Sequence, residues 1–263
     1  MKQQSKRTVC LTVALAAIIL LLVCEIAGFS NLIGVDGKLA DSLDMTVTRA
    51  LGGVAFIAML VNLGYRVLDP LKKPFWSSML YSLPAFAIAI NNFPFSQVIK
   101  GNATVTDGWG AVALLFLECM CVGFFEESAF RGVVFLGLLR RDPHNRLWAF
   151  ASIAISSAVF GLVHLINIFE SSPVAVLMQI GYSALIGAMC AVILMKTANL
   201  WLCVVIHGLF NFAGAVIPRC GVGEIWDSFT VILTVIVSLA VLAYMIALFV
   251  KDEMSAVEEI YKK

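Results

Sequence analysis

The sequence predicts an all-α fold, a bundle of membrane-spanning helices. Three observations support this prediction: 61% of the 263 residues are hydrophobic, only 13% are charged, and the mean hydropathy is +0.96. Soluble domains carry about 25% charged residues, so a soluble fold of this length could not cover so much apolar surface. The same composition excludes a disordered chain, which would be polar and highly charged.

Charge and cysteine content argue against two further classes of protein. The net charge is only +1 and the basic residues fall in short clusters between apolar runs, so we expect no nucleic-acid partner. Of the seven cysteines, all except Cys220 lie inside apolar runs, where a thiol packs as a small apolar group. Because Cys220 then has no partner in a loop, we expect no disulfide framework.

Eight apolar runs are long enough to cross the hydrocarbon core, which takes about 20 residues. They cover residues 8–29, 47–67, 75–95, 109–139, 147–169, 173–195, 198–217 and 228–250. The first run has no small-residue cleavage pattern, so we interpret it as a retained span rather than a signal peptide. The fourth run would be a helix of about 46 Å, so we expect one end to extend beyond the bilayer. We treat residues 1–263 as a single membrane domain.

The distribution of lysine and arginine predicts the orientation of the bundle. With the N-terminus in the cytosol, the segments on the cytosolic side hold 13 of the 18 basic residues and those on the opposite side hold four. This asymmetry follows the positive-inside rule. An even number of spans then places both termini in the cytosol. Short loops and the lack of an extra domain lead us to expect an integral protein of a bacterial cell membrane.

The fourth span contains an unusual group of ionisable residues, Glu126, Glu127 and Arg131. Each such group at membrane depth is costly unless paired, and therefore indicates a function. Glu127 and Arg131 have the i, i+4 spacing of a helical ion pair, which structural stabilisation alone would explain. The pair does not explain the second glutamate. We expect an apolar setting to raise the pKa of Glu126 towards neutrality, as a general base requires.

Two later spans each carry a histidine followed by an asparagine. The fifth span contains Phe160, His164 and Asn167, and the seventh contains His207 and Asn211 on one helical face. A single histidine inside a membrane is usually a packing or hydrogen-bonding residue. A carboxylate and two imidazoles on three helices can instead bind a metal or activate a water, and a histidine beside an asparagine can stabilise an oxyanion.

One geometric condition limits this interpretation. Measured along straight helices, His207 lies about 16 Å beyond Lys196 and His164 lies about 27 Å beyond Arg146. The two histidines can therefore meet only if the fifth span begins outside the bilayer, tilts or is displaced.

These motifs resemble those of the CPBP family (CAAX proteases and bacteriocin-processing enzymes, also called the Abi family). The family pattern is Glu-Glu-x-x-x-Arg, then Phe-x-x-x-His, then His-x-x-x-Asn, each on a separate apolar span. The resemblance covers residues 109–217, which we interpret as the catalytic core. The matching residues are Glu126, Glu127, Arg131, Phe160, His164, His207 and Asn211.

The resemblance implies an eight-helix intramembrane endopeptidase that hydrolyses a membrane-associated or lipid-linked peptide. By the resemblance, Glu126 and His164 would activate the water, and His207 with Asn211 would stabilise the oxyanion. The supporting residues would be Glu127, Arg131, Phe160 and Asn167. If a metal takes part, zinc is the expected ion, with Glu126, His164 and His207 as ligands. The implied partners are a peptide or protein substrate and the lipid bilayer.

Two other classes of function fit parts of the pattern. A non-catalytic immunity factor or scaffold of the same fold would tolerate conservative loss of Glu126. A proton-coupled transporter would use Glu126 and the histidines as a proton relay, but such transporters show paired repeats, and the sequence contains no internal repeat.

Overall fold

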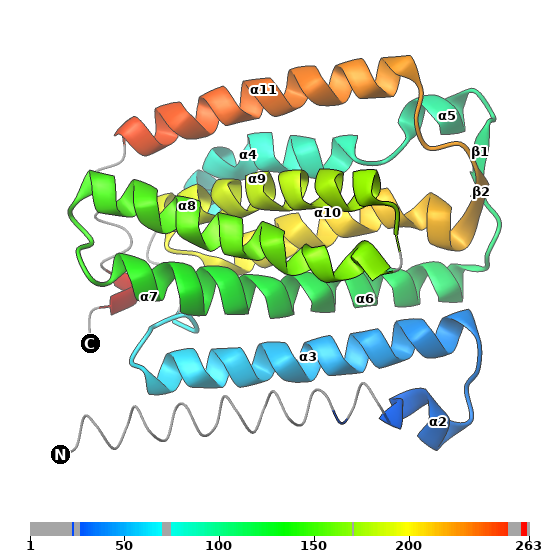
Figure 1. Cartoon of the computed structure of the whole chain (residues 1–263), viewed down its shortest axis with the longest axis horizontal. Helices are drawn as coiled ribbons and strands as arrows, with labels where there is room; N and C mark the ends of the chain where they lie inside the picture. Colours follow the sequence, from blue (N-terminus) through cyan, green and yellow to red (C-terminus); the bar gives the residue numbers. More distant parts are fainter. Residues whose placement is uncertain (1–22, 24–26, 70–74, 170, 252–258, 262–263) are drawn as a thin grey trace.

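The structure is a computed structural model that describes residues 23, 27–69, 75–169, 171–251 and 259–261. Long helices lie side by side with short connections at both ends of the bundle (Figure 1). The predicted all-α membrane bundle is confirmed. The elements in chain order are α2 (Phe29–Ile33), α3 (Lys38–Asn62), α4 (Phe75–Asn91), α5 (Phe95–Ile99), β1 (Ala103–Val105), α6 (Trp109–Glu127), the π-helix η1 (Ser128–Phe135), α7 (Leu136–Leu139), α8 (Arg146–Val163), the 3₁₀-helix η2 (His164–Phe169), α9 (Pro173–Thr197), α10 (Leu200–Cys220), β2 (Gly221–Gly223) and α11 (Ser228–Lys251).

Six helical segments of the described chain are long and apolar enough to cross a membrane. They correspond to six of the eight predicted spans, and α4, with 17 residues, corresponds to a seventh. The predicted span at residues 8–29 lies almost entirely outside the described residues. The orientation with both termini in the cytosol stays a prediction.

The second span differs from its predicted range of 47–67. Helix α3 begins nine residues earlier and ends at Asn62, because polar side chains at its start do not break it. Thr46 and Thr48 donate their hydroxyl hydrogens to carbonyl oxygens one turn back, at 2.7 and 2.8 Å, which removes the cost of unpaired polar atoms. The helix stops where Gly64 adopts a φ of 86°, a conformation that suits glycine.

Residues 109–139 form one continuous helix in which the π-helix η1 lies between α6 and α7 (Figure 1). Single π-helical segments in α-helices often occur at functional sites, and this one begins directly after Glu127. Helix α6 packs closely against α10, because two glycines face each other. A Cβ atom on Gly123 would lie only 2.9 Å from the backbone nitrogen of Gly208. Glycine at both positions lets the two helix backbones approach.

The α9–α10 hairpin forms the centre of the bundle, and two of the residues in its tip are buried. Thr197 and Asn199 in the tip are 1% and 5% exposed. Asn199 Oδ1 accepts hydrogen bonds from the first backbone N–H groups of α10, and Trp201 Nε1 donates to the carbonyl oxygen of Val67 at 3.1 Å. Because these residues are buried, α10 begins deep in the bundle, and a residue near its start can lie level with the far end of α8.

Residues 259–261 cover the end of the bundle that carries α7. Ile260 is 2% exposed, its carbonyl oxygen accepts a hydrogen bond from Arg66 N, and Tyr261 Oη donates to the carbonyl oxygen of Leu136. Burial raises the pKa of the Tyr261 hydroxyl above its usual range, so this tyrosine remains a hydrogen-bond donor at neutral pH.

The opposite end of the bundle carries a two-stranded antiparallel sheet of β1 and β2 (Figure 1). Cys220, which we predicted in a loop, is instead the last residue of α10 and is 4% exposed. Its carbonyl oxygen accepts hydrogen bonds from the backbone N–H groups of Thr106 and Asp107. The link between α10 and α11 is tied to α5 through Asp227, whose Oδ2 accepts from Lys100 Nζ at 2.6 Å.

Candidate functional site

The carboxylate of Glu127 contacts side chains from two different elements, η1 and α10. Its Oε1 lies 2.8 Å from His207 Nδ1, and its Oε2 lies 3.1 Å from Arg131 Nε. Glu127 and Arg131 are 0% and 1% exposed. The predicted i, i+4 ion pair therefore forms, and it places a neutralising cation next to a carboxylate in an apolar interior.

The Glu126 side chain lies on the other side of the same histidine. Its Oε2 is 3.3 Å from His207 Nε2, and 19% of the side chain is exposed. Both ring nitrogens of His207 thus face carboxylates, and a carboxylate cannot donate unless it is protonated. A hydrogen bond at either contact therefore needs its hydrogen on the imidazole nitrogen or on the carboxylate that faces it.

The ring of Phe160 contacts the guanidinium of Arg131 and both imidazole rings. The Arg131 guanidinium lies over the ring at 4.4 Å from its centroid, and the rings of His164 and His207 meet it edge-on at 5.2 and 5.6 Å. The cation–π contact helps to stabilise a buried guanidinium, whose Nη1 and Nη2 atoms have no hydrogen-bond partner among the described residues. Both histidines therefore contact the same ring, which brings α8 and α10 together at this point.

His164 lies at the junction of α8 and the 3₁₀-helix η2. Its Nδ1 is 3.0 Å from the carbonyl oxygen of Phe160. Since a carbonyl oxygen only accepts hydrogen bonds, this contact requires the hydrogen on Nδ1, and Nε2 of the neutral ring keeps its lone pair. His164 is half-buried, while Val163 and Ile166 are 53% and 70% exposed. The histidine therefore lies at the margin between the protein interior and an apolar outer face.

The two predicted asparagines are placed differently from each other. Asn211 lies one helical turn after His207 on α10, is half-buried, and its side chain has no hydrogen-bond partner among the described residues. Asn167 instead donates a hydrogen bond to Gln179 Oε1 at 2.8 Å and ties η2 to α9. Asn211 is free to bind a ligand, whereas Asn167 positions the segment that carries His164.

Gly187 on α9 is a site residue that sequence reasoning missed. A Cβ atom there would lie 2.6 Å from Arg131 Nη2 and 3.3 Å from both the Phe160 ring and Ser157 Oγ. The guanidinium of Arg131 therefore occupies the space that a side chain at position 187 would fill. A glycine within an apolar helical run indicates close packing, but nothing in the sequence identifies Arg131 as the neighbour.

The three predicted metal ligands do not converge. In the part of the chain that the structure describes, the group of three donors within 4.8 Å of one another is Glu127, Cys190 and Cys203, not Glu126, His164 and His207. The Nδ1 contacts of both histidines are those expected of metal ligands. Glu126 Oε2 and His207 Nε2 lie 3.3 Å apart, but Glu126, His164 and His207 are not a group whose ligand atoms all lie within 4.8 Å of one another. The donor types fit a zinc ion and the spacing does not.

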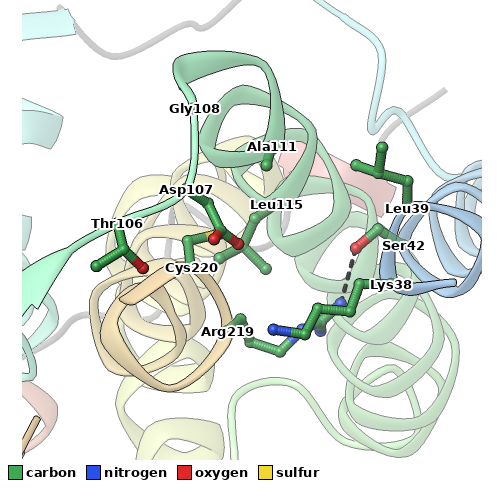
Figure 2. Close-up of a pocket in the computed structure, with 10 residues that line it drawn as sticks. All are labelled: Lys38, Leu39, Ser42, Thr106, Asp107, Gly108, Ala111, Leu115, Arg219 and Cys220. Carbon is green, nitrogen blue, oxygen red and sulfur yellow. Dashed lines mark hydrogen bonds between the residues drawn. The ribbon is translucent and has the colours of Figure 1, made fainter. Parts of the chain in front are cut away.

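A separate cavity of about 450 Å³ lies at the sheet end of the bundle (Figure 2). Arg219 in its wall donates to both oxygens of Glu118 at 2.8 and 3.0 Å and to Ser42 Oγ at 2.7 Å. This network joins α10, α6 and α3, and it pairs the buried carboxylate of Glu118 with a cation. None of the residues predicted for the site lines this cavity.

Residues 108–213 match the family model of the type II CAAX prenyl endopeptidase Rce1-like domain. The match spans the segment that holds all three motifs, and it confirms the resemblance to the CPBP and CAAX intramembrane protease family. No curated protein and no solved structure matched the chain.

Proposed function

We propose, from the CAAX endopeptidase domain at residues 108–213, that this protein is an intramembrane endopeptidase. Its active site would be formed by Glu126, His164, His207 and Asn211. The observation that carries the proposal is the unequal pairing of two adjacent carboxylates. Glu127 is fixed by Arg131 and His207, whereas Glu126 has no arginine or lysine partner among the described residues, faces His207 and keeps some exposure.

In the proposed reaction, Glu126 is the general base. It accepts a proton from a water molecule, and the resulting hydroxide attacks the carbonyl carbon of the scissile peptide bond. The lone pair on Nε2 of His164 can accept a hydrogen bond from the same water and orient it. The proton held by Glu126 then passes to the leaving amine as the carbon–nitrogen bond breaks, which returns Glu126 to its starting state.

The negative charge that develops on the carbonyl oxygen needs hydrogen-bond donors. Nε2 of His207, when it carries a hydrogen, and the free amide of Asn211 would supply them from the same face of α10. Glu127, bound to His207 Nδ1, would keep the imidazole in the orientation that directs Nε2 towards the substrate. Donors fixed before the reaction stabilise an oxyanion at little reorganisation cost.

A bound zinc ion would polarise the carbonyl group and lower the pKa of a water. Because the spacing of Glu126, His164 and His207 does not fit such an ion, no step proposed here depends on one.

The substrate class follows from the surroundings of His164. Large apolar side chains next to it are exposed, among them Leu162 at 57% and Ile166 at 70%. On a membrane-spanning helix these side chains face the lipid. We therefore propose a peptide that approaches through the bilayer, anchored by an apolar segment or a covalently attached lipid close to the scissile bond.

A direct test uses the full-length protein in lipid vesicles with peptides that differ in one feature. The peptides share one sequence and carry a prenyl group, an acyl chain or no lipid, and mass spectrometry identifies the products. Cleavage of the lipid-bearing peptides, with much slower cleavage of the unmodified one, would support the proposal. Equal cleavage of all three would contradict the substrate class, and cleavage of none would contradict the assignment for these substrates.

A further inference from the structure

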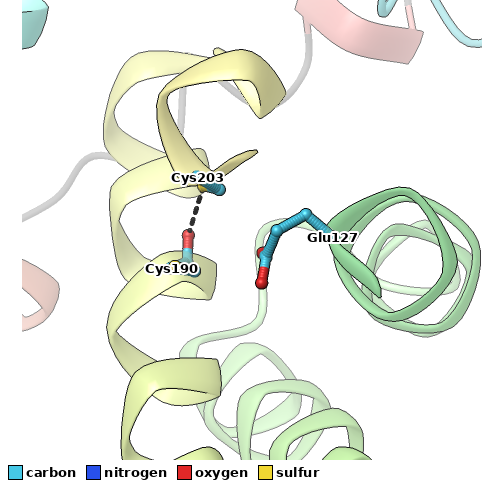
Figure 3. A group of neighbouring side chains, drawn as sticks. All are labelled: Glu127, Cys190 and Cys203. Atoms are coloured by element: carbon cyan, nitrogen blue, oxygen red, sulfur yellow. Dashed lines mark hydrogen bonds between the residues drawn. The ribbon is translucent and has the colours of Figure 1, made fainter. Parts of the chain in front are cut away.

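Two cysteines lie directly behind the carboxylate of Glu127. The ligand atoms of Glu127, Cys190 and Cys203 all lie within 4.8 Å of one another, and the three residues are each 0% exposed. They come from α6, α9 and α10, and Figure 3 shows the carboxylate of Glu127 directed towards the two cysteine-bearing helices. The proposed reaction uses neither thiol.

The hairpin brings the two cysteines together and fixes the Cys203 thiol. Cys203 Sγ donates to the carbonyl oxygen of Cys190 at 3.2 Å, with a second acceptor in the carbonyl oxygen of Asn199 at 3.9 Å. Both cysteines are free. Two thiols from facing helices and one carboxylate are thus held at one point in the most buried part of the bundle.

This donor set suits one class of ligand. Thiolates select soft and borderline cations, and with a carboxylate they form a common ligand set for Zn²⁺. Neighbouring ligand atoms on a tetrahedral zinc ion lie roughly 3.5–3.8 Å apart, as zinc–sulfur bonds of about 2.3 Å require. The three donors would need to close by about 1 Å, a movement within the range of side-chain rotation.

The charge balance of the site also allows a divalent cation. Without an ion the two thiols are neutral, and the charges of Glu127 and Arg131 cancel. A divalent cation that binds both sulfurs displaces two protons to the solvent, so the net charge of the group does not change. A charge-neutral exchange avoids the cost of adding charge to an apolar interior.

We infer that Glu127, Cys190 and Cys203 form a binding site for a thiophilic divalent cation, of which Zn²⁺ is the biological example. An ion bound here competes for the carboxylate that holds Arg131 and His207. Binding therefore lowers catalytic turnover, a consequence that rests on the proposed function. The binding itself does not depend on that function.

Cadmium provides a readout independent of activity. The full-length protein in detergent, kept reduced with a phosphine, is incubated with Cd²⁺ and freed of unbound ion by gel filtration. Bound cadmium is measured by elemental mass spectrometry and by the ultraviolet charge-transfer band of cadmium thiolates. The variant Cys190→Ser/Cys203→Ser is compared with Cys119→Ser/Cys220→Ser, a matched control that removes two other buried thiols.

The wild-type protein and the control should each bind about one cadmium ion per chain with the thiolate band, as one closed site predicts, and the Cys190/Cys203 variant should lose both. No thiolate band in the wild-type protein, or a band that survives in the Cys190/Cys203 variant, would overturn the inference.

Zinc X-ray absorption of the wild-type protein gives an answer that needs no variant. Two sulfur scatterers at about 2.3 Å are expected, and a shell of only oxygen and nitrogen would overturn the inference. Metal binding in a protein that cleaves no peptide would contradict the proposed function alone.

Discussion

Glu127 Oε1 and His207 Nδ1 lie 2.8 Å apart although 80 residues separate them in the chain. This contact joins α6 to α10 at the point where α6 becomes a π-helix. It leaves Nε2 of His207 directed at Glu126, so the structural carboxylate and the proposed catalytic carboxylate share one imidazole.

Arg131→Ala should destabilise the protein by about 3 kcal/mol, since it leaves Glu127 as a buried charge without its cation. The double variant Glu127→Gln/Arg131→Met should cost less than Arg131→Ala, because no net buried charge remains. Unfolding in detergent, followed by circular dichroism, gives the free energies. Simple additivity of the single changes would show that the two residues are not coupled.

Gly187→Ala should lower both stability and turnover, because the added methyl group would lie 2.6 Å from Arg131 Nη2. Overpacking of this kind costs about 1–3 kcal/mol. Gly181→Ala on the same helix is the matched control, since no atom lies within 4 Å of its added Cβ. Thermal unfolding and peptide cleavage are measured for both variants, and equal behaviour of the two would contradict the assigned role of Gly187.

Asn211→Ala should lower the turnover number by roughly 100-fold, the effect of removing one oxyanion donor. The Michaelis constant should change much less, because the donor acts on charge that develops during the reaction. Steady-state kinetics on a cleaved peptide separates the two constants. A change confined to the Michaelis constant would place Asn211 in substrate binding instead.

The link between α5 and α11 should be sensitive to acid. The hydrogen bond from Lys100, with those from Thr230 and Ser96, holds the pKa of Asp227 below its usual range. A lowered pKa in the folded state means that the ionised form stabilises the fold above the unfolded value of about 4, and that this stabilisation is lost as the pH falls below it.

Asp227→Asn should therefore lower the melting temperature at pH 7, and the difference from the wild-type protein should shrink below about pH 4. Melting curves at several pH values test this. A difference that is constant across the whole pH range would contradict the role given to the Asp227 carboxylate.

The sequence predicted the fold class and most spans because apolar runs and charge clusters are local features. It misplaced the start of α3, where Thr46 and Thr48 satisfy their hydroxyls within the helix. It also gave no sign that the α9–α10 tip is buried, with Thr197 only 1% exposed. The burial of a hairpin tip depends on the segments that cover it. Those segments are distant in the sequence, so the residues of the hairpin alone do not predict the contacts.

For the candidate site, the sequence predicted the Glu127–Arg131 pair because its spacing is set by one helix. The contact of both histidines with Phe160 and the space provided by Gly187 involve different helices. The cysteine pair was missed for a related reason. Cys190 and Cys203 look like ordinary apolar packers until the hairpin brings them to Glu127.

The most direct test of the central claim is the rate of peptide cleavage by Glu126→Gln in lipid vesicles, with Glu118→Gln as the control for loss of a membrane carboxylate. Glutamine keeps the shape of Glu126 but cannot take a proton, so the rate should fall by roughly 100-fold or more. Glu118 pairs with Arg219 away from the site, so its variant, once shown to be folded, should retain most of the rate. Cleavage by Glu126→Gln at the wild-type rate would contradict the assignment of Glu126 as the general base.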